Sequence, residues 1–461
     1  MTCKKSSRSL PALALAFCLA LPAAALAQDA VQPEAQPAAA TAEQGTAQAA
    51  PSSFDLKQAV EFGLANNPTM VSARAQLLGS EYDQNSALAD FLPTATASYG
   101  VLSYDRQPQS GDQTAWTGQL NIDQPVFTGF KLLSTYQKAK LAKEQNQAKL
   151  TQTELSLIGS IQTYYLSHLK AKMDVKSAQD SVERLKSQLK VTTAFFDVGL
   201  KPKLDVLQAE VDLADAEQTL LKAQNSLDTT RAKLNSLLNL PLEAPVTYVG
   251  ELTYQPFNLG LTECLNRAYK ARPDILIGVK SVGMAEKDKT IAGSSFYPQV
   301  SADYNYYKKG DSASLNESKN LSNSAREYWT VGANASWTFF QWGSTYNKFK
   351  SGGETVNKMR ADLENTKLGA GFEVKQYLLN QREAADRISV ARKSVEAARE
   401  SYRMALARYQ AQVGTNTDVL DAQAKVSSSE ASLSQALSDY QTALSNLYVA
   451  MGEKNPPLEI R

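Results

Sequence analysis

The chain repeats itself at a fixed spacing, and this internal duplication limits which folds it can adopt. Five residues of the first half recur 205 positions later: Leu56, Pro68, Phe91, Pro93 and Tyr99 correspond to Leu261, Pro273, Phe296, Pro298 and Tyr304. From Trp116 onward the spacing is 213, and it holds to the end of both halves. The spacing changes where the second half carries a longer Gly/Ser/Asn-rich stretch, 309–325. The sequence therefore predicts two structural repeats, 54–250 and 256–455.

Each repeat contains one helical segment of unusual length. Residues 126–201 and 299–455 contain no proline, and Lys131–Phe196 is rich in the helix formers Lys, Gln, Leu and Ala. Such a helix is about 100 Å long at 1.5 Å per residue, which exceeds the thickness of any globular core. It must therefore lie beside other helices. We predict two long antiparallel hairpins, at about 130–240 and 343–452.

The return helix of the first hairpin has a seam of apolar or small residues at a spacing of three and four, which is typical of coiled coils: Leu204, Leu207, Val211, Ala214 and then Leu221. Its counterpart, 422–447, is rich in Ala and Ser, which permits helices to approach closely. An ordinary two-helix hairpin with no pore would show the same periodicity.

Four segments of about ten residues alternate apolar and polar side chains: about 94–104, 116–126, 299–308 and 328–339. This pattern is typical of outer-membrane barrel strands, although half-buried strands of a soluble sheet would also show it. Four strands cannot close a barrel, and an open sheet edge is not viable in lipid. A membrane barrel would therefore be shared between identical subunits, and three copies would supply twelve strands above twelve long helices. The predicted fold class is mainly α, with a trimeric α-barrel and a shared 12-stranded β-barrel.

The N-terminus has the pattern of a secretory signal. Lys4, Lys5 and Arg8 precede an apolar run, and Ala25-Leu26-Ala27 supplies the small residues of a cleavage site. We expect a signal peptide at 1–27 and a flexible Ala/Pro/Gln-rich leader at 28–53. No later apolar run approaches the roughly 18 residues of a spanning helix. The mature chain is expected to be a soluble periplasmic, a secreted or a β-barrel protein.

The composition excludes several classes of function. The chain has 48 Lys plus Arg against 47 Asp plus Glu, so it lacks the basic surface of a nucleic-acid binder. One His and three Cys leave little material for a metal site or a catalytic triad. We expect no enzyme activity, no cofactor and no metal. Cys264 is the only thiol after the signal peptide, and we expect it to be a small buried residue.

The order of motifs resembles the TolC-like outer-membrane efflux and secretion channel family over Phe54 to about Gly452. The strand-to-helix junctions are Pro125-Val126-Phe127-Thr128-Gly129 and Phe340-Gln341-Trp342-Gly343. The turn motifs are Phe196-x-Val198-Gly199-Leu200 with Asp205-Val206-Leu207, and Tyr409 with Val413-Gly414-Thr415 and Asp418-Val419-Leu420-Asp421-Ala422. The resemblance implies a homotrimeric exit duct in the outer membrane, in contact with its lipid and with a long periplasmic extension. A periplasmic adaptor would connect it to an inner-membrane transporter of an efflux pump or a type I secretion system, where specificity for the cargo is expected.

The two turns are the predicted docking surface for the adaptor. By resemblance, Val198, Gly199 and Leu200 of the first turn and Val413 and Gly414 of the second contact the adaptor tip. Both glycines also have a structural interpretation, because tight helix ends often require a positive φ.

Three carboxylates follow the turns. Asp418 and Asp421 share a helical face, and the resemblance places this pair at the periplasmic pore constriction, with Asp205 as a further candidate. A ring of carboxylates would bind cations and repel anions. Simple capping of the helix starts is the alternative for these residues, above all for Asp205.

One position departs from the best-known family members, which carry an Arg in the second turn that helps to hold the tip closed. This chain has Asn416 there, and Gln412 where the first repeat has Gly199. A charge-assisted latch from position 416 is therefore not expected, although Lys201 and Lys203 could substitute. The alternative function is a soluble periplasmic coiled-coil adaptor, but adaptors typically have one hairpin, whereas this chain has two.

Overall fold

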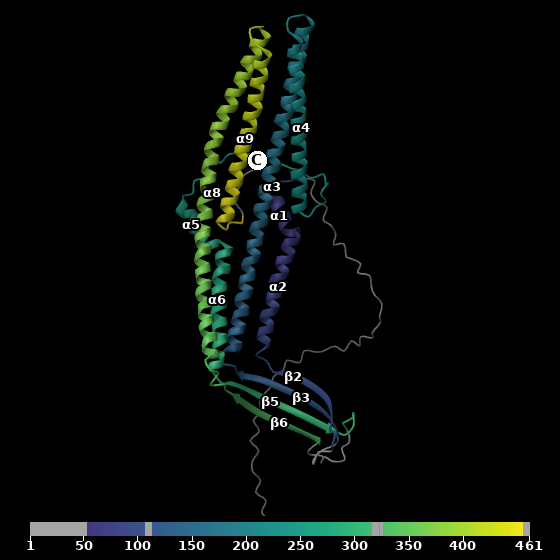
Figure 1. Cartoon of the computed structure of the whole chain (residues 1–461), viewed down its shortest axis with the longest axis vertical. Coiled ribbons are helices and arrows are strands. Elements are labelled where there is room, and N and C mark those ends of the chain that lie inside the picture. Colours follow the sequence, from purple (N-terminus) through teal and green to yellow (C-terminus); the bar gives the residue numbers. More distant parts are fainter. Residues whose placement is uncertain (1–52, 107–112, 316–321, 323–325, 455–461) are drawn as a thin grey trace, which may run out of the picture. The chain divides into compact units, whose positions relative to one another are not determined.

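Two very long helices run through the chain without interruption. In the computed structural model, α3 spans Lys131–Asp197 and α8 spans Ser344–Gln410, each 67 residues. The structure describes residues 53–106, 113–315, 322 and 326–454. Each reverses into a helix of 35 residues packed alongside it, α4 (Lys203–Leu237) and α9 (Asn416–Ala450) (Figure 1). The expected signal peptide and all but the last residue of the expected leader lie outside the described residues.

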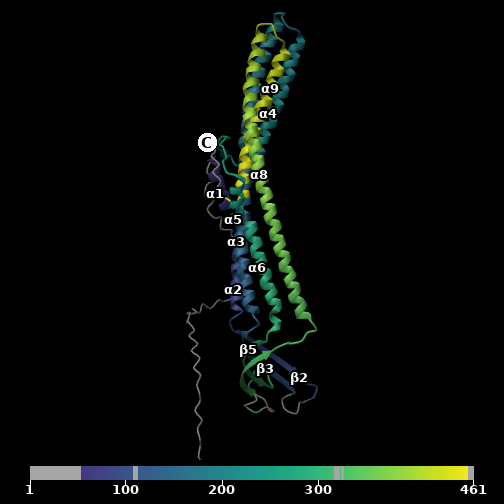
Figure 2. The same cartoon turned by 90° about the vertical axis from the view of Figure 1, so that its left-hand side faces the viewer.

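Shorter helices pack along the part of each long helix that is distant from the hairpin turn. α1 (Leu56–Asn66) and α2 (Pro68–Ala89) belong to the first repeat; α5 (Leu261–Ala271), α6 (Pro273–Gly293) and a 3₁₀ turn, η1 (Ser294–Phe296), belong to the second. Pro68 and Pro273 each begin a helix, where the missing N–H is not needed. α6 packs between α3 and α8 (Figure 2). In the described part of the chain, no helix has the length and apolar character needed to cross a bilayer.

Glycines allow α6 and α8 to approach closely. A Cβ atom added to Gly352 would lie 3.1 Å from the Cα of Lys289, and one added to Gly278 would lie 2.8 Å from a methyl group of Leu363. Gly352 therefore serves helix packing. This packing role agrees with the sequence, because Gly352 is not surrounded by the residues that a nucleotide-binding loop requires.

A four-stranded antiparallel sheet joins the two repeats. β2 (Thr94–Ser103), β3 (Thr114–Phe127), β5 (Gln299–Gly310) and β6 (Glu327–Ser336) lie in that order, so β2 and β6 form its edges (Figure 1). β6 ends at Ser336, three residues before the predicted end. Ser336 pairs with Gln299, and the next residue on the partner strand is Pro298, which has no N–H to donate.

The strand register separates an apolar face from a polar face. Leu120 pairs with Tyr306 and Ile122 pairs with Tyr304 on the first face, whereas Asn121 pairs with Asn305 on the other. On the polar face, the Asn121 side-chain amide donates a hydrogen bond of 2.8 Å to Asn305. One face is therefore suited to lipid and the other to water.

The main core lies where the helices of both repeats meet. Apolar residues of α3 between Leu157 and Leu169 and of α9 between Ala436 and Leu447 are buried together with residues of α1, α5 and α8. Cys264 of α5 is fully buried there, as expected. This core joins the two hairpins at the end that is distant from their turns.

A short parallel pair closes the first repeat. β1 (Ser53–Phe54) pairs with β4 (Thr247–Tyr248), and the buried Tyr165 hydroxyl of α3 donates to the carbonyl oxygens of Phe54 (3.0 Å) and Val249 (2.6 Å). The earliest described residues are therefore fixed to the segment that follows α4.

Candidate functional site at the helical tip

The two hairpin turns differ in how they use glycine. Gly199 has a φ of 79°, and the residue with positive φ in the second turn is Gln412, at 61°. The expectation that Gly414 supplies a positive φ is therefore wrong. Gly414 serves close packing instead, because a Cβ atom there would lie 3.2 Å from backbone atoms of Arg408 and Tyr409. Gln412 occupies the position equivalent to Gly199, so the turn keeps its shape at a cost of about 1–2 kcal/mol.

The predicted docking residues are exposed apolar groups at the two turns. Val198 is 68% exposed, Leu200 52% and Val413 67%. The Nζ of Lys201, in the first turn, lies 5.1 Å from the ring centroid of Tyr409, at the end of α8. Both turns therefore belong to one surface (Figure 1), which we call the tip. The role of these residues in docking stays a prediction.

Asn416 occupies a buried site between the two hairpins. It is 2% exposed; its Nδ2 donates to the carbonyl oxygen of Asp205 on α4 (3.1 Å), and its Oδ1 accepts from Nε2 of Gln188 on α3 (2.8 Å). The hydroxyl of Tyr409 donates to Oγ1 of Thr192 on α3 (3.2 Å). Asn416 thus joins the two hairpins through neutral hydrogen bonds. The sequence did not predict these bonds, because a polar residue such as Asn is usually exposed and nothing indicated that this one is buried.

The carboxylates that follow the turns have different surroundings. Asp418 and Thr415 form a capping box at the start of α9: the Asp418 carboxylate accepts from the Thr415 backbone N–H (3.0 Å), and this bond lowers the pKa of Asp418. Asp205 lies in the first turn of α4, but the capping position there is Pro202 and provides no side-chain bond. A capping hydrogen bond therefore describes Asp418 and not Asp205, although the carboxylate of Asp205 in the first turn of α4 still suits the helix dipole. Pore constriction by Asp205, Asp418 and Asp421 stays a prediction.

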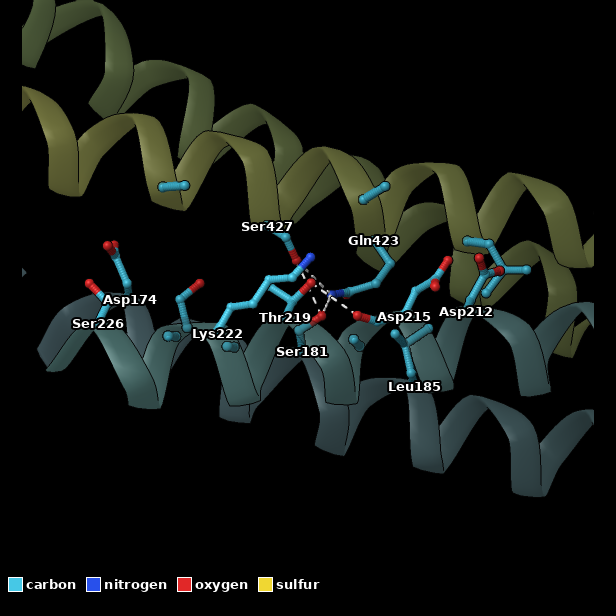
Figure 3. A pocket seen from close by; sticks show the side chains of 17 residues that line it. Asp174, Ser181, Leu185, Asp212, Asp215, Thr219, Lys222, Ser226, Gln423 and Ser427 are labelled. Carbon is cyan, nitrogen blue, oxygen red and sulfur yellow. Dashed lines mark hydrogen bonds between the residues drawn. The ribbon is translucent and has the colours of Figure 1, made fainter. Parts of the chain in front are cut away.

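Asp421 faces a groove between α4 and α9. It lines a cavity of about 440 Å³ together with Leu207, Val211 and Asp212. Burial, followed by the neighbouring carboxylates Asp215 and Asp421, raises the pKa of Asp212. The groove continues away from the tip as a cavity of about 590 Å³ floored by α3 (Figure 3).

Side-chain hydrogen bonds join α3 and α9 along this groove, beside buried apolar residues such as Leu185 and Val426, and the sequence did not predict these polar contacts. Nε of Arg184 donates to Oε1 of Gln423 (2.8 Å). Figure 3 shows a second bond, in which Nε2 of Gln423 donates to Oγ of Ser181 (3.1 Å). The Ser-rich composition of α9 was the available signal, because hydroxyl groups at an interface imply hydrogen bonds as well as close approach. We call this contact surface, from Ser177 to Thr192 on α3 and from Asn416 to Glu430 on α9, the polar seam.

The chain is similar to known outer-membrane proteins. It is 23% identical over 368 residues to outer membrane protein TolC of Vibrio cholerae, which covers 77% of this chain and 81% of that protein. It is 24% identical over 255 residues to toxin and drug export protein A of Aggregatibacter actinomycetemcomitans, and this match spans 53% of this chain and only 54% of that protein. The solved structure of outer membrane protein VceC, also from Vibrio cholerae, matches with a TM-score of 0.74 at 19% identity, over 86% of this chain and 96% of that chain.

These matches confirm the predicted fold class, which is TolC-like and mainly helical. The sequence profile of the outer membrane efflux protein family matches residues 61–240 and 264–453, one segment in each repeat. Because these two segments include most of the chain, the protein belongs to the outer membrane efflux protein family.

Proposed function

We propose that this chain forms the outer-membrane exit duct of a tripartite efflux pump or type I secretion system. The observation that carries the proposal is the tip, where two long hairpins present exposed apolar turns beside a groove that contains carboxylates. Family membership supports it, as does similarity to a relative named for toxin and drug export. The matched family is one of efflux proteins and not of enzymes, and it gives no support to the soluble-adaptor alternative.

The duct would be a homotrimer. α8 carries one row of exposed apolar side chains, spaced so that a helix of 3.6 residues per turn places them on one side: Leu368, Phe372, Leu379, Val390 and Met404. α2 has a matching exposed row, Val71, Leu78 and Tyr82, and α4 has Leu204, Leu207 and Val211. Burying the α8 row against α2 and α4 of a neighbouring copy would remove these apolar surfaces from water.

The sheet is the part that would lie in the membrane. Its edges β2 and β6 would pair with those of neighbouring copies, since an open edge is not viable in lipid. Exposed aromatic residues gather just after β6, where Phe339 is 81% exposed and Trp342 89%. Aromatic side chains prefer the membrane–water boundary, so this junction would lie at the periplasmic face of the outer membrane.

The tip would dock the periplasmic adaptor of an inner-membrane transporter. Val198, Gly199 and Leu200 of the first turn, with Val413 and Gly414 of the second, would form the docking surface. The exposure of the three apolar side chains among them supports this role. Asp421, with Asp205 and Asp418, would line the constriction. Asp421 is the best placed of the three, because its groove already contains Asp212 and excess negative charge favours cations.

Conductance of the detergent-purified protein in a planar bilayer tests the proposal. We expect small, stable, cation-selective openings. Asp421→Asn should lower the cation-to-anion permeability ratio, whereas Asp362→Asn, the matched control at an exposed carboxylate of α8 distant from the tip, should leave the ratio unchanged. Unchanged selectivity in Asp421→Asn would remove Asp421 from the constriction, and failure of a folded protein to insert into the bilayer would contradict the exit duct itself.

A further inference from the structure

The two hairpins are held together in chemically different ways along their length. On the side distant from the tip, α3 and α9 share the apolar core, which includes Leu166 and Leu169 of α3 and Ala436 and Leu437 of α9. On the tip side they meet through the polar seam. Separating an apolar core exposes buried hydrocarbon to water, which is unfavourable. Water can replace the hydrogen bonds of a polar seam, so separation there costs much less.

Glu430 of α9 lies where the apolar core gives way to the polar seam. Its Oε1 accepts two hydrogen bonds from Arg399 of α8 (3.1 and 2.7 Å), and its Oε2 accepts one from Ser177 of α3 (2.8 Å). The guanidinium of Arg184, also on α3, lies 3.8 Å from Oε2. The Glu430 side chain is only 12% exposed, so its charge is partly screened from water. One carboxylate thus connects three helices of both hairpins.

The seam on the tip side of Glu430 is incompletely bonded. Among the described residues, Nη2 of Arg184 and Oε1 of Gln188 are buried without a hydrogen-bond partner. A buried polar atom without a hydrogen bond is unfavourable, and it can bond to water if the seam opens. The hydrogen bonds that hold the seam on this side include those of Gln423 with Arg184 and Ser181, and that of Asn416 with Gln188.

We propose that Glu430 is a positioning residue that holds α3, α8 and α9 together at a pivot. The two hairpins of one chain separate from this pivot toward the tip. The seam opens from the tip as far as Ser181 and Ser427, and the Glu430 clamp with the apolar core behind it stays closed. This inference rests on the proposed exit duct, because it assigns the hinge of that duct's gate.

Disulfide staples test the pivot, in an Asn416→Ala background that relaxes the tip. Ser181→Cys with Ser427→Cys joins α3 to α9 on the tip side of Glu430, where the two hydroxyl oxygens lie 3.3 Å apart. Ser394→Cys with Ser429→Cys is the matched control, because its 3.0 Å pair joins α8 to α9 within one hairpin. We expect the first staple to lower open conductance at least roughly tenfold, with recovery on reduction, and the control staple to leave it unchanged. Equal conductance of both oxidised variants would overturn the pivot.

Thiol labelling tests the pivot without any conducting state. Single cysteines at the buried positions Thr192, on the tip side, and Ser434, on the core side, are treated with maleimide in the full-length protein. We expect Thr192→Cys to react at least about tenfold faster than Ser434→Cys, which corresponds to about 1.4 kcal/mol in opening free energy. Glu430→Gln should speed the labelling of Ser434→Cys but not that of Ser445→Cys, a fully buried control in the core.

Equal labelling rates at Thr192→Cys and Ser434→Cys with Glu430 intact would contradict the pivot. A protein that labels as expected yet never conducts would instead contradict the exit duct.

Discussion

At the scale of single residues, the second turn shows what motif matching can and cannot locate. The Val-Gly motif of that turn drew attention to Gly414, yet the left-handed backbone conformation falls on Gln412. The repeat offset was the better guide, because it aligns Gln412 with Gly199. For Asn416, the sequence predicted only that a charged latch is missing at this position. Its burial could not be inferred, because Gln188 and the Asp205 carbonyl come from the other hairpin, and their proximity depends on how the hairpins pack.

Replacing Gln412 with Gly should stabilise the protein. Gly adopts a φ of 61° without the clash of a Cβ atom, so Gln412→Gly should raise the free energy of unfolding by about 1 kcal/mol. Gln410→Gly, at the last residue of α8, should lower it by about 0.5–1 kcal/mol. Thermal unfolding of the two variants makes the comparison, and a lower Tm for Gln412→Gly would show that the side chain has an unrecognised role.

The single histidine makes stability depend on pH. His168 is 6% exposed, and burial, together with Arg231 and Lys172, lowers its pKa from 6.5 to about 4. Below pH 6.5 the unfolded chain binds a proton at this site that the folded chain does not bind. Stability is therefore lost as the pH falls from 6.5 to about 4, by up to about 3 kcal/mol. His168→Gln, which can still bond to Thr230, should flatten the loss of Tm between pH 7 and 5. An unchanged slope would place the titration elsewhere.

At the scale of elements, helix lengths and strand faces were predictable because each depends on local periodicity. The absence of proline from 126–201 predicted α3, and the alternation of side chains predicted the two faces of the sheet. The end of β6 was not predictable from its own residues. It depends on where Pro298 falls on the neighbouring strand. The polar seam was missed for a similar reason, since α9 alone does not show which helix its serines meet.

The contact between α6 and α8 should respond to a single methyl group. Gly352→Ala places a Cβ atom 3.1 Å from the Lys289 backbone and should destabilise the protein by about 1–3 kcal/mol. Gly369→Ala on the same helix meets no atom within 4 Å and should stabilise it by about 1 kcal/mol through helix propensity. Chemical denaturation of the two variants should give changes of opposite sign. If both stabilise, α6 and α8 can move apart without cost.

At the scale of the whole molecule, the sequence predicted the fold class, and the family followed from the order of its motifs. Trimerisation stays a proposal, and the α8 row of apolar residues is the feature on which it can be tested. Phe372→Asp with Leu379→Asp introduces two charges into that row and should convert the trimer into monomers. Light scattering of the detergent-solubilised protein measures the mass. Asn380→Asp, an exposed substitution on another side of α8, is the matched control and should remain trimeric.

The parallel pair β1–β4 has a consequence for the order in which the first repeat folds. Ser53–Phe54 leave the export machinery early, but their partners Thr247–Tyr248 follow about 190 residues later. Until then the Tyr165 hydroxyl also lacks one of its two acceptors. The N-terminal end of this unit is thus among the first stretches to be synthesised and among the last in its repeat to be fixed.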